Sequence, residues 1–221
     1  MITQGSVAPL PTVSISDGVQ PTLMMGKQAE LMTAALMRDI YEQTLRGNTF
    51  HATTTPLGLA IPIYTATAPT VALWNPAGSG KNAVLQKLGI VYASGTADFA
   101  AVGLMRRTGV GSTVATGAVF TAFAEATPIN GLIGAGATSA MKVAIAGTVT
   151  LTAAGAAGDF FYILAGINLE AQTGTAHATA LGVHEFHGEV IVPPGVAVWL
   201  AATKASSALY AQTLTWTEAP V

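Results

Sequence analysis

The segment Tyr210-Ala-Gln-Thr-Leu-Thr-Trp216 has the clearest two-residue alternation in the chain. Tyr210, Gln212, Leu214 and Trp216 fall on one side of an extended backbone, and small Ala and Thr residues fall on the other. This pattern predicts a β-strand with one face in a core and the other toward weakly polar surroundings. A β-rich fold follows if similar segments recur along the chain.

Similar segments do recur through most of the sequence after residue 50. Gly, Pro, Asn or Ser interrupts the chain at intervals of about ten residues, and the pieces between are rich in β-branched and aromatic residues. This spacing is typical of an antiparallel β-sandwich or barrel. A tract rich in Gly, Ala and Thr, from Thr108 to Thr138, is expected to be an extended connection with short strands. The expected strands are Leu57–Tyr64, Thr70–Trp74, Ala83–Ser94, Phe99–Arg106, Met141–Thr152, Phe160–Ile167, His187–Val192, Val196–Thr203 and Leu209–Trp216.

One helix is expected, near the N-terminus. The stretch Lys27–Arg46 has neither Gly nor Pro, and Met32, Leu36 and Ile40 follow each other at four-residue intervals. Gly47-Asn48 is a typical stop signal for such a helix. No second helical stretch is found that could build a βαβ unit, so a nucleotide-binding α/β fold is not expected.

The residues before this helix are expected to form an extended arm. Residues 1–25 have too few large apolar side chains to fold alone, and prolines prevent a long helix there. These prolines are Pro9, Pro11 and Pro21. We expect the arm to lie across a neighbouring subunit, and we divide the chain into an arm with helix (1–49) and one β-sandwich domain (50–221).

Charged residues are scarce. Lys+Arg number 9 and Asp+Glu number 11, so 9% of the residues are charged, against about 25% in ordinary soluble domains. Much of the surface should therefore be weakly polar and suited either to a bilayer or to a large protein assembly. The longest charge-poor stretch, Leu132–Gly158, contains Lys142 and consists mostly of small residues, so no membrane partner is expected.

The net charge and the absence of cysteine exclude further classes of partner and site. The net charge is −2 and there is no long basic run, which argues against nucleic acid as a partner. The absence of cysteine excludes disulfides and Cys-based metal sites. We expect the chain to associate with copies of itself and with other proteins of an assembly.

The stretch Asn75–Val84, NPAGSGKNAV, has the glycines and the lysine of a phosphate-binding loop. That motif requires Gly at its start and Ser or Thr after the lysine, and Asn stands at both positions here. No helix is expected to follow. We interpret the stretch as a loop between two strands, with Gly78 and Gly80 at positive φ and Lys81 in solvent.

The stretch His184-Glu-Phe-His-Gly-Glu189 gathers side chains that can bind a metal. Its histidines are three residues apart, which differs from the spacing of the zincin helix motif and would place them on opposite faces of a strand. Gly78-Ser-Gly80 is not a nucleophile elbow, and catalytic side chains are few throughout. We therefore expect no enzyme and no cofactor. Two-ligand metal sites remain open for the pairs His187 with Glu189, His184 with His51, and His184 with His177.

The three tryptophans, Trp74, Trp199 and Trp216, allow two interpretations. They could form a platform on which sugar rings stack. Tryptophans inside strands are more often core or interface anchors, and Trp216 shares a face with other apolar residues. We favour the core or interface interpretation.

Three segments resemble stretches of tailed-bacteriophage virion proteins, a group of small, charge-poor β-sandwich proteins of the head surface or the tail. They are Leu73-Trp-Asn-Pro-Ala-Gly-Ser-Gly-Lys-Asn82, Gly188-Glu-Val-Ile-Val-Pro-Pro-Gly-Val196 and Leu214-Thr-Trp-Thr-Glu218. The resemblance implies a jelly-roll-like sandwich that decorates or cements a capsid, or forms part of a tail or fibre. It carries over no catalytic residue.

The resulting hypothesis is a structural subunit of the virion, assembled in the host cytoplasm. It would decorate or cement the capsid as a homo-oligomer, a trimer being one option, in contact with the major capsid protein or other virion proteins. The alternative is a carbohydrate- or receptor-binding module of a tail or fibre. The candidate assembly contacts are Pro9, Pro11, Pro21, Arg106, Arg107 and Trp199.

Overall fold

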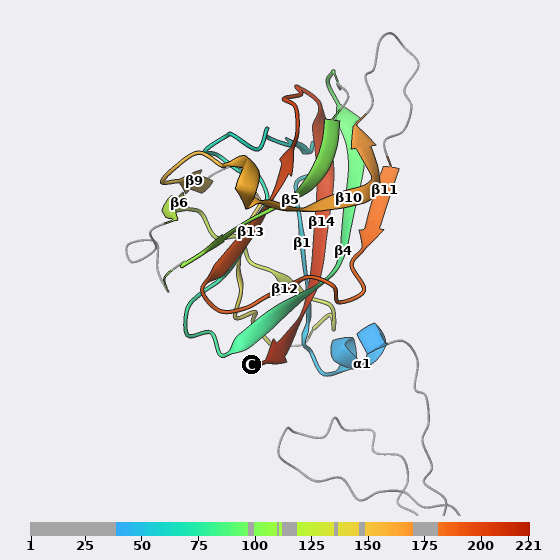
Figure 1. Cartoon of the computed structure of the whole chain (residues 1–221). Helices are drawn as coiled ribbons and strands as arrows, with labels where there is room; N and C mark the ends of the chain where they lie inside the picture. Colours follow the sequence, from blue (N-terminus) through green and yellow to red (C-terminus); the bar gives the residue numbers. More distant parts are fainter. Residues whose placement is uncertain are drawn as a thin grey trace, which may run out of the picture.

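A computed structural model of the chain shows antiparallel β-sheets with a short α-helix at their base (Figure 1). The mainly β, antiparallel fold expected from the alternating segments is confirmed. The structure describes residues 39–96, 100–109, 111, 119–134, 137–145, 149–169 and 181–221. Among these, no helix has the length and hydropathy needed to span a bilayer.

The first sheet is built around the C-terminal strand. Its strands follow the order β11-β4-β14-β1-β7, while β12 pairs with β4 and β2 pairs with β14. The strands are β1 (Thr49–Thr53), β2 (Leu59–Ala60), β4 (Lys81–Ser94), β7 (Ile129–Asn130), β11 (Leu181–Glu185), β12 (Ile191–Val192) and β14 (Leu209–Pro220). The longest pairing, between β4 and β14, joins Lys81 to Pro220 at one end and Ser94 to Leu209 at the other.

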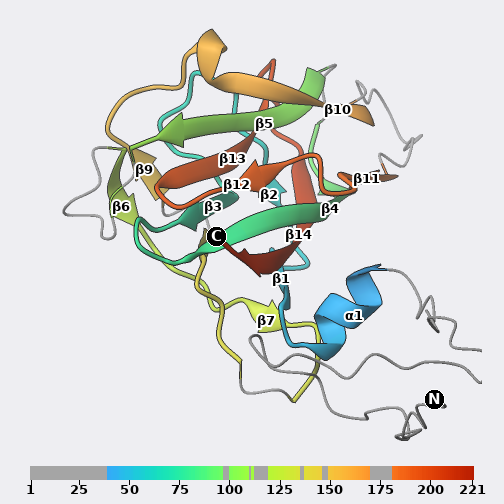
Figure 2. The ribbon, with the colours of Figure 1, turned by 60° about the horizontal axis from the view of Figure 1, so that its bottom comes forward.

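The second sheet has the order β10-β5-β13-β3-β8, and a separate pair, β6 with β9, lies beside it. These strands are β3 (Ala72–Asn75), β5 (Ala100–Thr108), β6 (Phe120–Phe123), β8 (Lys142–Ala144), β9 (Val149–Leu151), β10 (Phe160–Leu169) and β13 (Val196–Ala202), with a 3-10 turn η1 (Ala157–Asp159) before β10. The turned view separates β10, β5, β13 and β3 from β4, β14 and β1 (Figure 2).

Eight of the strands pair in a nested order. In chain sequence they are β1, β3, β4, β5, β10, β11, β13 and β14, and the first pairs with the last, the second with the seventh, the third with the sixth and the fourth with the fifth. All four pairings are antiparallel. The chain is therefore doubled back on itself, which brings segments distant in sequence into contact throughout the fold.

The main core lies between the two sheets. Tyr210, Gln212, Leu214 and Trp216 of β14 are all buried, as their alternation predicts, and Trp216 stacks on Phe50 with ring centroids 6.1 Å apart. The second sheet contributes apolar residues from β3, β5 and β13 to the same cluster. Burial of this apolar surface is the main stabilising term of the fold.

A second core covers the other face of the second sheet. Trp74 of β3 and Trp199 of β13 lie in it, with Phe120 and Phe123 of β6 and apolar residues of β9. The sequence of β13, VAVWLAA, lacks polar residues because both faces of that strand are covered. The β6–β9 pair is thus a partial third layer.

The helix α1 (Asp39–Leu45) lies inside the predicted Lys27–Arg46 and ends one residue early. Residues 27–38, like the expected arm of residues 1–25, lie outside the described residues. Two strands were not predicted, β1 and β11. The expected strand Met141–Thr152 is wrong as a single element, because its two ends form β8 and β9, which belong to different sheets.

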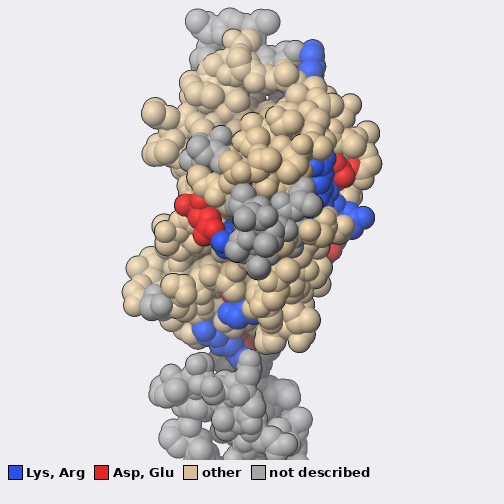
Figure 3. All heavy atoms as spheres, turned by 90° about the vertical axis from the view of Figure 1, so that its left-hand side faces the viewer, with Lys and Arg blue, Asp and Glu red and all other residues tan. Residues whose placement is uncertain are grey.

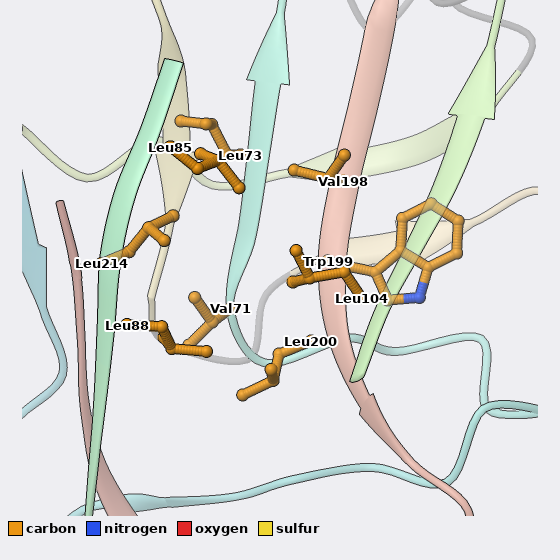
Figure 4. Close-up of a pocket in the computed structure, with 9 residues that line it drawn as sticks. All are labelled: Val71, Leu73, Leu85, Leu88, Leu104, Val198, Trp199, Leu200 and Leu214. Atoms are coloured by element: carbon orange, nitrogen blue, oxygen red, sulfur yellow. The ribbon is translucent and has the colours of Figure 1, made fainter. Parts of the chain in front are cut away.

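One small cavity lies between the two sheets. Its volume is about 10 Å³, and apolar side chains of both sheets line it, among them Leu73, Leu88 and Leu200 (Figure 4). That volume is near the lower limit for a single water molecule, and its lining offers no polar partner. The cavity is a packing gap in the core and has no room for a small-molecule ligand.

Candidate functional site

Charged side chains are sparse on the surface and largely occupied with each other. The face shown in Figure 3 has a few acidic and basic groups among uncharged ones. Among the described residues, four Lys or Arg side chains form ion pairs with acidic residues: Arg46 with Glu42, Lys81 with Glu218, Arg107 with Asp159 and Lys142 with Glu125. The surface is therefore weakly polar in the way that the composition predicts.

The loop between β3 and β4 is built around Asn75. Its buried amide donates to the carbonyl oxygens of Lys81 and Val192, each at 2.8 Å, and its Oδ1 accepts from Ser79 Oγ at 2.6 Å. Two glycines have positive φ, 86° at Gly78 and 69° at Gly80, which confirms the expected loop geometry. The backbone groups of this loop serve the protein's own turn, so the loop is a structural closure rather than a phosphate cradle.

Lys81 is not a free solvated charge, contrary to our expectation. Its Nζ lies 3.0 Å from Oε2 of Glu218, whose side chain is fully buried. Glu218 also accepts hydrogen bonds from Ser139 Oγ at 2.5 Å and from the backbone N–H of Ala140 at 2.9 Å. The carboxylate thus ties the end of β14 to the start of β4 and to the segment that leads into β8 of the second sheet.

The stretch His184–Glu189 interrupts an edge of the first sheet. β11 and β12 both pair with β4, but their register differs by three residues, because Glu185 lies opposite Lys87 and Ile191 lies opposite Val84. The extra residues are taken up by a tight turn, Phe186–Glu189, in which Glu189 N donates to Phe186 O at 2.8 Å. The central residues have positive φ, 48° at His187 and 82° at Gly188, the pattern of a type I′ turn. The expected strand His187–Val192 is therefore shorter, because His187 belongs to the turn.

Both histidines have partners within the chain: His187 Nε2 lies 3.5 Å from Glu185 Oε2, and His184 lies beside Tyr162. Tyr162 donates to Glu189 Oε2 at 2.8 Å and lies 3.2 Å from His184 Nε2, which connects the edge strands of both sheets. The hydrogen bond to Glu189 raises the pKa of the Tyr162 phenol, and burial and the charge of Glu189 add to the shift.

The other proposed metal ligands do not come together in the described part of the chain. His51 is on β1, and β4 and β14 lie between it and His184 on β11, a separation of about 14 Å for three strand spacings. Burial, with a smaller effect of Lys87, lowers the pKa of His51, which lies 3.0 Å from Thr215 Oγ1. No group of three His, Asp or Glu is placed to bind a metal among the described residues. His177 lies outside them.

All three tryptophans are buried. Trp74 and Trp216 are inaccessible and Trp199 is 2% exposed, so none of their rings presents a face to a sugar. The preferred interpretation as core anchors is confirmed. Trp199 was also expected to be a candidate assembly contact, and its ring is covered within its own chain, so it offers almost no surface to a neighbouring subunit.

Arg106 and Arg107, which are adjacent on β5, have different roles. The guanidinium of Arg107 donates to Ala153 O at 2.9 Å, to Ala154 O at 2.5 Å and to Asp159 Oδ2 at 3.1 Å, and it lies over the ring of Trp199. Arg107 thus fixes the segment before β10. Arg106 is exposed, with its guanidinium carbon 5.9 Å from the ring centroid of Phe161, and it remains a candidate assembly contact. Pro9, Pro11 and Pro21 lie outside the described residues.

A matched pair of substitutions tests this division. Arg107→Ala should lower the free energy of unfolding by about 2 kcal/mol, because it removes charge-assisted hydrogen bonds and leaves Asp159 without its cationic partner. Arg106→Ala should change it by less than about 0.5 kcal/mol, as expected for an exposed residue. Urea unfolding followed by tryptophan fluorescence measures both. Equal losses for the two variants would contradict the assigned roles.

Large apolar side chains are exposed at several places on the surface. Ile133, at 92%, is the most exposed of them in the described part of the chain, and Leu57, Val183, Ile129, Ile163 and Ile191 each exceed 50%. The sequence predicted a weakly polar surface but not these residues, because exposed Ile, Leu and Val have the same chemistry as the residues of the core. Apolar side chains exposed together mark protein contact surfaces.

Comparison of the chain with known protein families, with curated proteins and with solved structures finds no match. The surface features above therefore supply the basis for a functional proposal.

Proposed function

We propose that the two sheets form a jelly-roll sandwich and that the chain is a structural subunit of a phage particle, with capsid decoration or cementing as its role. The observation that carries the proposal is the nested pairing of eight strands. β1-β14-β4-β11 and β3-β13-β5-β10 are the two four-stranded orders that result when a doubled chain is rolled into two sheets. Viral capsid domains, lectins and cupins use this architecture.

Among these proteins, the interior and the surface of the chain favour a structural role like that of the viral capsid domains. The interior is filled by apolar side chains around a cavity of about 10 Å³, which supports a role without a small-molecule ligand. The buried tryptophans give no support to a sugar-stacking platform. A surface with few unpaired charges and exposed Ile, Leu and Val suits contacts repeated many times over a symmetric shell.

The resemblance of three segments to virion proteins agrees with this proposal, and the structure gives those segments a physical role. The loop that begins at Asn75, the turn that ends at Gly195 and the terminal strand around Glu218 meet at one end of the sheets. Gly195 N donates to Asn75 O at 2.9 Å, and Lys81 pairs with Glu218. A subunit that must withstand mechanical load benefits from such a closed end.

Particles of the phage that encodes the chain test the proposal. We expect the protein in density-purified particles by mass spectrometry, in many copies per particle. Particles made without its gene should release DNA at a lower temperature, measured with a DNA-binding dye, and addition of the purified chain should restore the release temperature.

The same particles separate the proposal from its alternative. A receptor-binding module predicts normal DNA release but lost adsorption to host cells when the gene is absent. Purified particles that lack the chain altogether would contradict both roles.

A further inference from the structure

Asn130 lies where the end of α1, the start of β1 and the edge strand β7 meet. It pairs with Phe50 of β1, and its side chain is buried. Its Nδ2 donates to Gly47 O at 2.7 Å, and its Oδ1 accepts from Leu132 N at 2.8 Å. Figure 2 shows β7 and α1 at the same end of the molecule. A single amide side chain therefore ties the residue pair that ends the helix to the edge of the first sheet.

Gly131, the next residue, is closely surrounded. A methyl group at this position would lie 3.0 Å from His51 Nε2 and 3.3 Å from Thr44 Cγ2, so a side chain would have to displace its neighbours. The N–H of Gly131 donates to Thr49 O at 2.8 Å. The fold thus selects asparagine at position 130 for its two hydrogen bonds and glycine at position 131 for its small size. Packing alone explains why these two residues are adjacent.

Asparagine followed by glycine is a chemically reactive pair, and Asn130-Gly131 is the only such pair in the chain. The backbone nitrogen of the second residue can attack the side-chain carbonyl carbon of the first, and glycine has no side chain to hinder it. The bond from Gly131 N to Asn130 Cγ forms, the bond from Cγ to Nδ2 breaks, and ammonia leaves with the proton of the Gly131 N–H. Water then opens the succinimide ring and gives aspartate or isoaspartate. Water is the only co-reactant.

The native hydrogen bonds hold this reaction back, and β7 is placed to release them. Attack requires that Gly131 N leaves Thr49 O and that the amide of Asn130 leaves its two partners. β7 has only two residues, Ile129 and Asn130, at the edge of the first sheet, and Ile129 is 67% exposed. Short segments with few buried contacts open at a lower free energy than the whole domain. Opening of β7 from β1 is therefore the easiest route to the reactive geometry.

We propose that Asn130 is a site of spontaneous deamidation, reached when β7 opens from β1, and that its product no longer ties α1 to the sheet. Aspartate has no N–H for Gly47 O and directs a carboxylate at that carbonyl oxygen, in a site that is only 8% exposed. Isoaspartate also lengthens the main chain by a carbon atom, which disturbs the pairing of β7 with β1. The inference does not depend on the proposed virion role.

Peptide mapping by mass spectrometry during long incubation of the full chain tests the site. We expect Asn130 to convert before Asn48 and Asn82, which are followed by Thr and Ala and serve as internal controls. In the chain unfolded by guanidinium chloride, conversion of Asn130 should be about a hundredfold faster, because three hydrogen bonds no longer protect the pair. Guanidinium below the unfolding transition should leave the native rate nearly unchanged, since local opening exposes little surface.

Asn130→Asp provides the side chain of the product directly and tests its effect on α1. Trypsin cleaves after arginine, and the side chain of Arg46 is exposed, whereas Gly47, the next residue, is buried. Cleavage between Arg46 and Gly47 should be about tenfold faster in Asn130→Asp than in the wild type, because one hydrogen bond fewer holds Gly47 in place. The matched control is Asn82→Asp, which adds the same charge at a half-buried position on β4 of the same sheet. Its cleavage rate should equal that of the wild type.

Gly131→Ala tests the chemistry independently of the fold. Its added methyl group should slow conversion of Asn130 in the unfolded chain, where packing against His51 plays no part. An unchanged rate there would overturn the succinimide route. In the native chain, conversion of Asn130 no faster than that of Asn82 would overturn the site, and a rate that rises with guanidinium in step with global unfolding would overturn the opening of β7. Equal trypsin cleavage of Asn130→Asp and the wild type would overturn the release of α1.

Discussion

Replacing Trp74 by alanine is expected to lower the free energy of unfolding by about 4 kcal/mol, a large part of the stability of a typical domain. Trp74 is inaccessible to solvent and lies between the second sheet and the β6–β9 pair. Its ring centroid is 5.5 Å from that of Phe120 and 5.3 Å from that of Phe123, and Lys142 Nζ lies over it at 5.1 Å. Alanine would leave a void that these neighbours cannot fill.

The control for this prediction is Trp74→Phe. Among the described residues, Trp74 Nε1 has no hydrogen-bond partner, so phenylalanine loses volume but breaks no polar contact. We expect a loss of about 1 kcal/mol, close to that of a conservative core exchange. Chemical denaturation measures both variants. Equal stability of Trp74→Ala and the wild type would show that the third layer contributes nothing, and loss of glycan binding without loss of stability would restore the sugar-binding interpretation.

Strands were predicted best from the sequence where the pattern was strong, either as alternation of apolar and small residues or as a continuous apolar run bounded by turn residues. β14 has strict alternation, and β13 has a continuous apolar run bounded by Pro193-Pro194-Gly195. β1 was not predicted because it begins directly after the helix stop signal Gly47-Asn48, and only Phe50 and Ala52 indicate its buried face. A strand of five residues gives two inward positions, too few to outweigh the helical pattern before it.

The region Met141–Thr152 shows a different limit. Residues that favour strands occur along the whole region, so it was predicted as one strand. The structure uses Lys142–Ala144 in the second sheet and Val149–Leu151 in the third layer, and Ala144 and Val149 still share one core cluster. The sheet that each half of this region joins is decided by tertiary packing, and a local sequence pattern holds no information on that packing.

The contacts that close the end of the sheets could not be predicted for a similar reason. Lys81 and Glu218 are 137 residues apart, and each looks like an ordinary exposed charge in its own segment. The loop glycines were identified correctly because positive φ is a local property. The exposed apolar residues, such as Ile133 and Leu57, have the same chemistry as core residues, so their exposure becomes visible only in the folded chain.

The substitution Glu218→Ala should lower the free energy of unfolding by about 3 kcal/mol, the second large effect that we expect. The side chain is fully buried, and its carboxylate accepts from Ser139 Oγ, the Ala140 N–H and Lys81 Nζ. Removal of the carboxylate would leave the partly buried donors of Ser139 and Ala140 unpaired and would separate β14 from the segment before β8. Lys81 loses less, since its side chain is 39% exposed and can be hydrated.

Two comparisons identify the cause of that loss. Glu218→Gln keeps an oxygen for Ser139 and Ala140 but loses the charge, so its cost should be about half that of alanine if the hydrogen bonds dominate. Glu125→Ala removes a carboxylate that also pairs with a lysine, Lys142, but Glu125 is half exposed, and such surface pairs contribute at most about 1 kcal/mol. Thermal and urea unfolding of the three variants give the ranking Glu218→Ala, Glu218→Gln, Glu125→Ala in decreasing loss. If Glu125→Ala cost as much as Glu218→Ala, burial would not be the source of the effect, and the closure at this end would be no stronger than any surface ion pair.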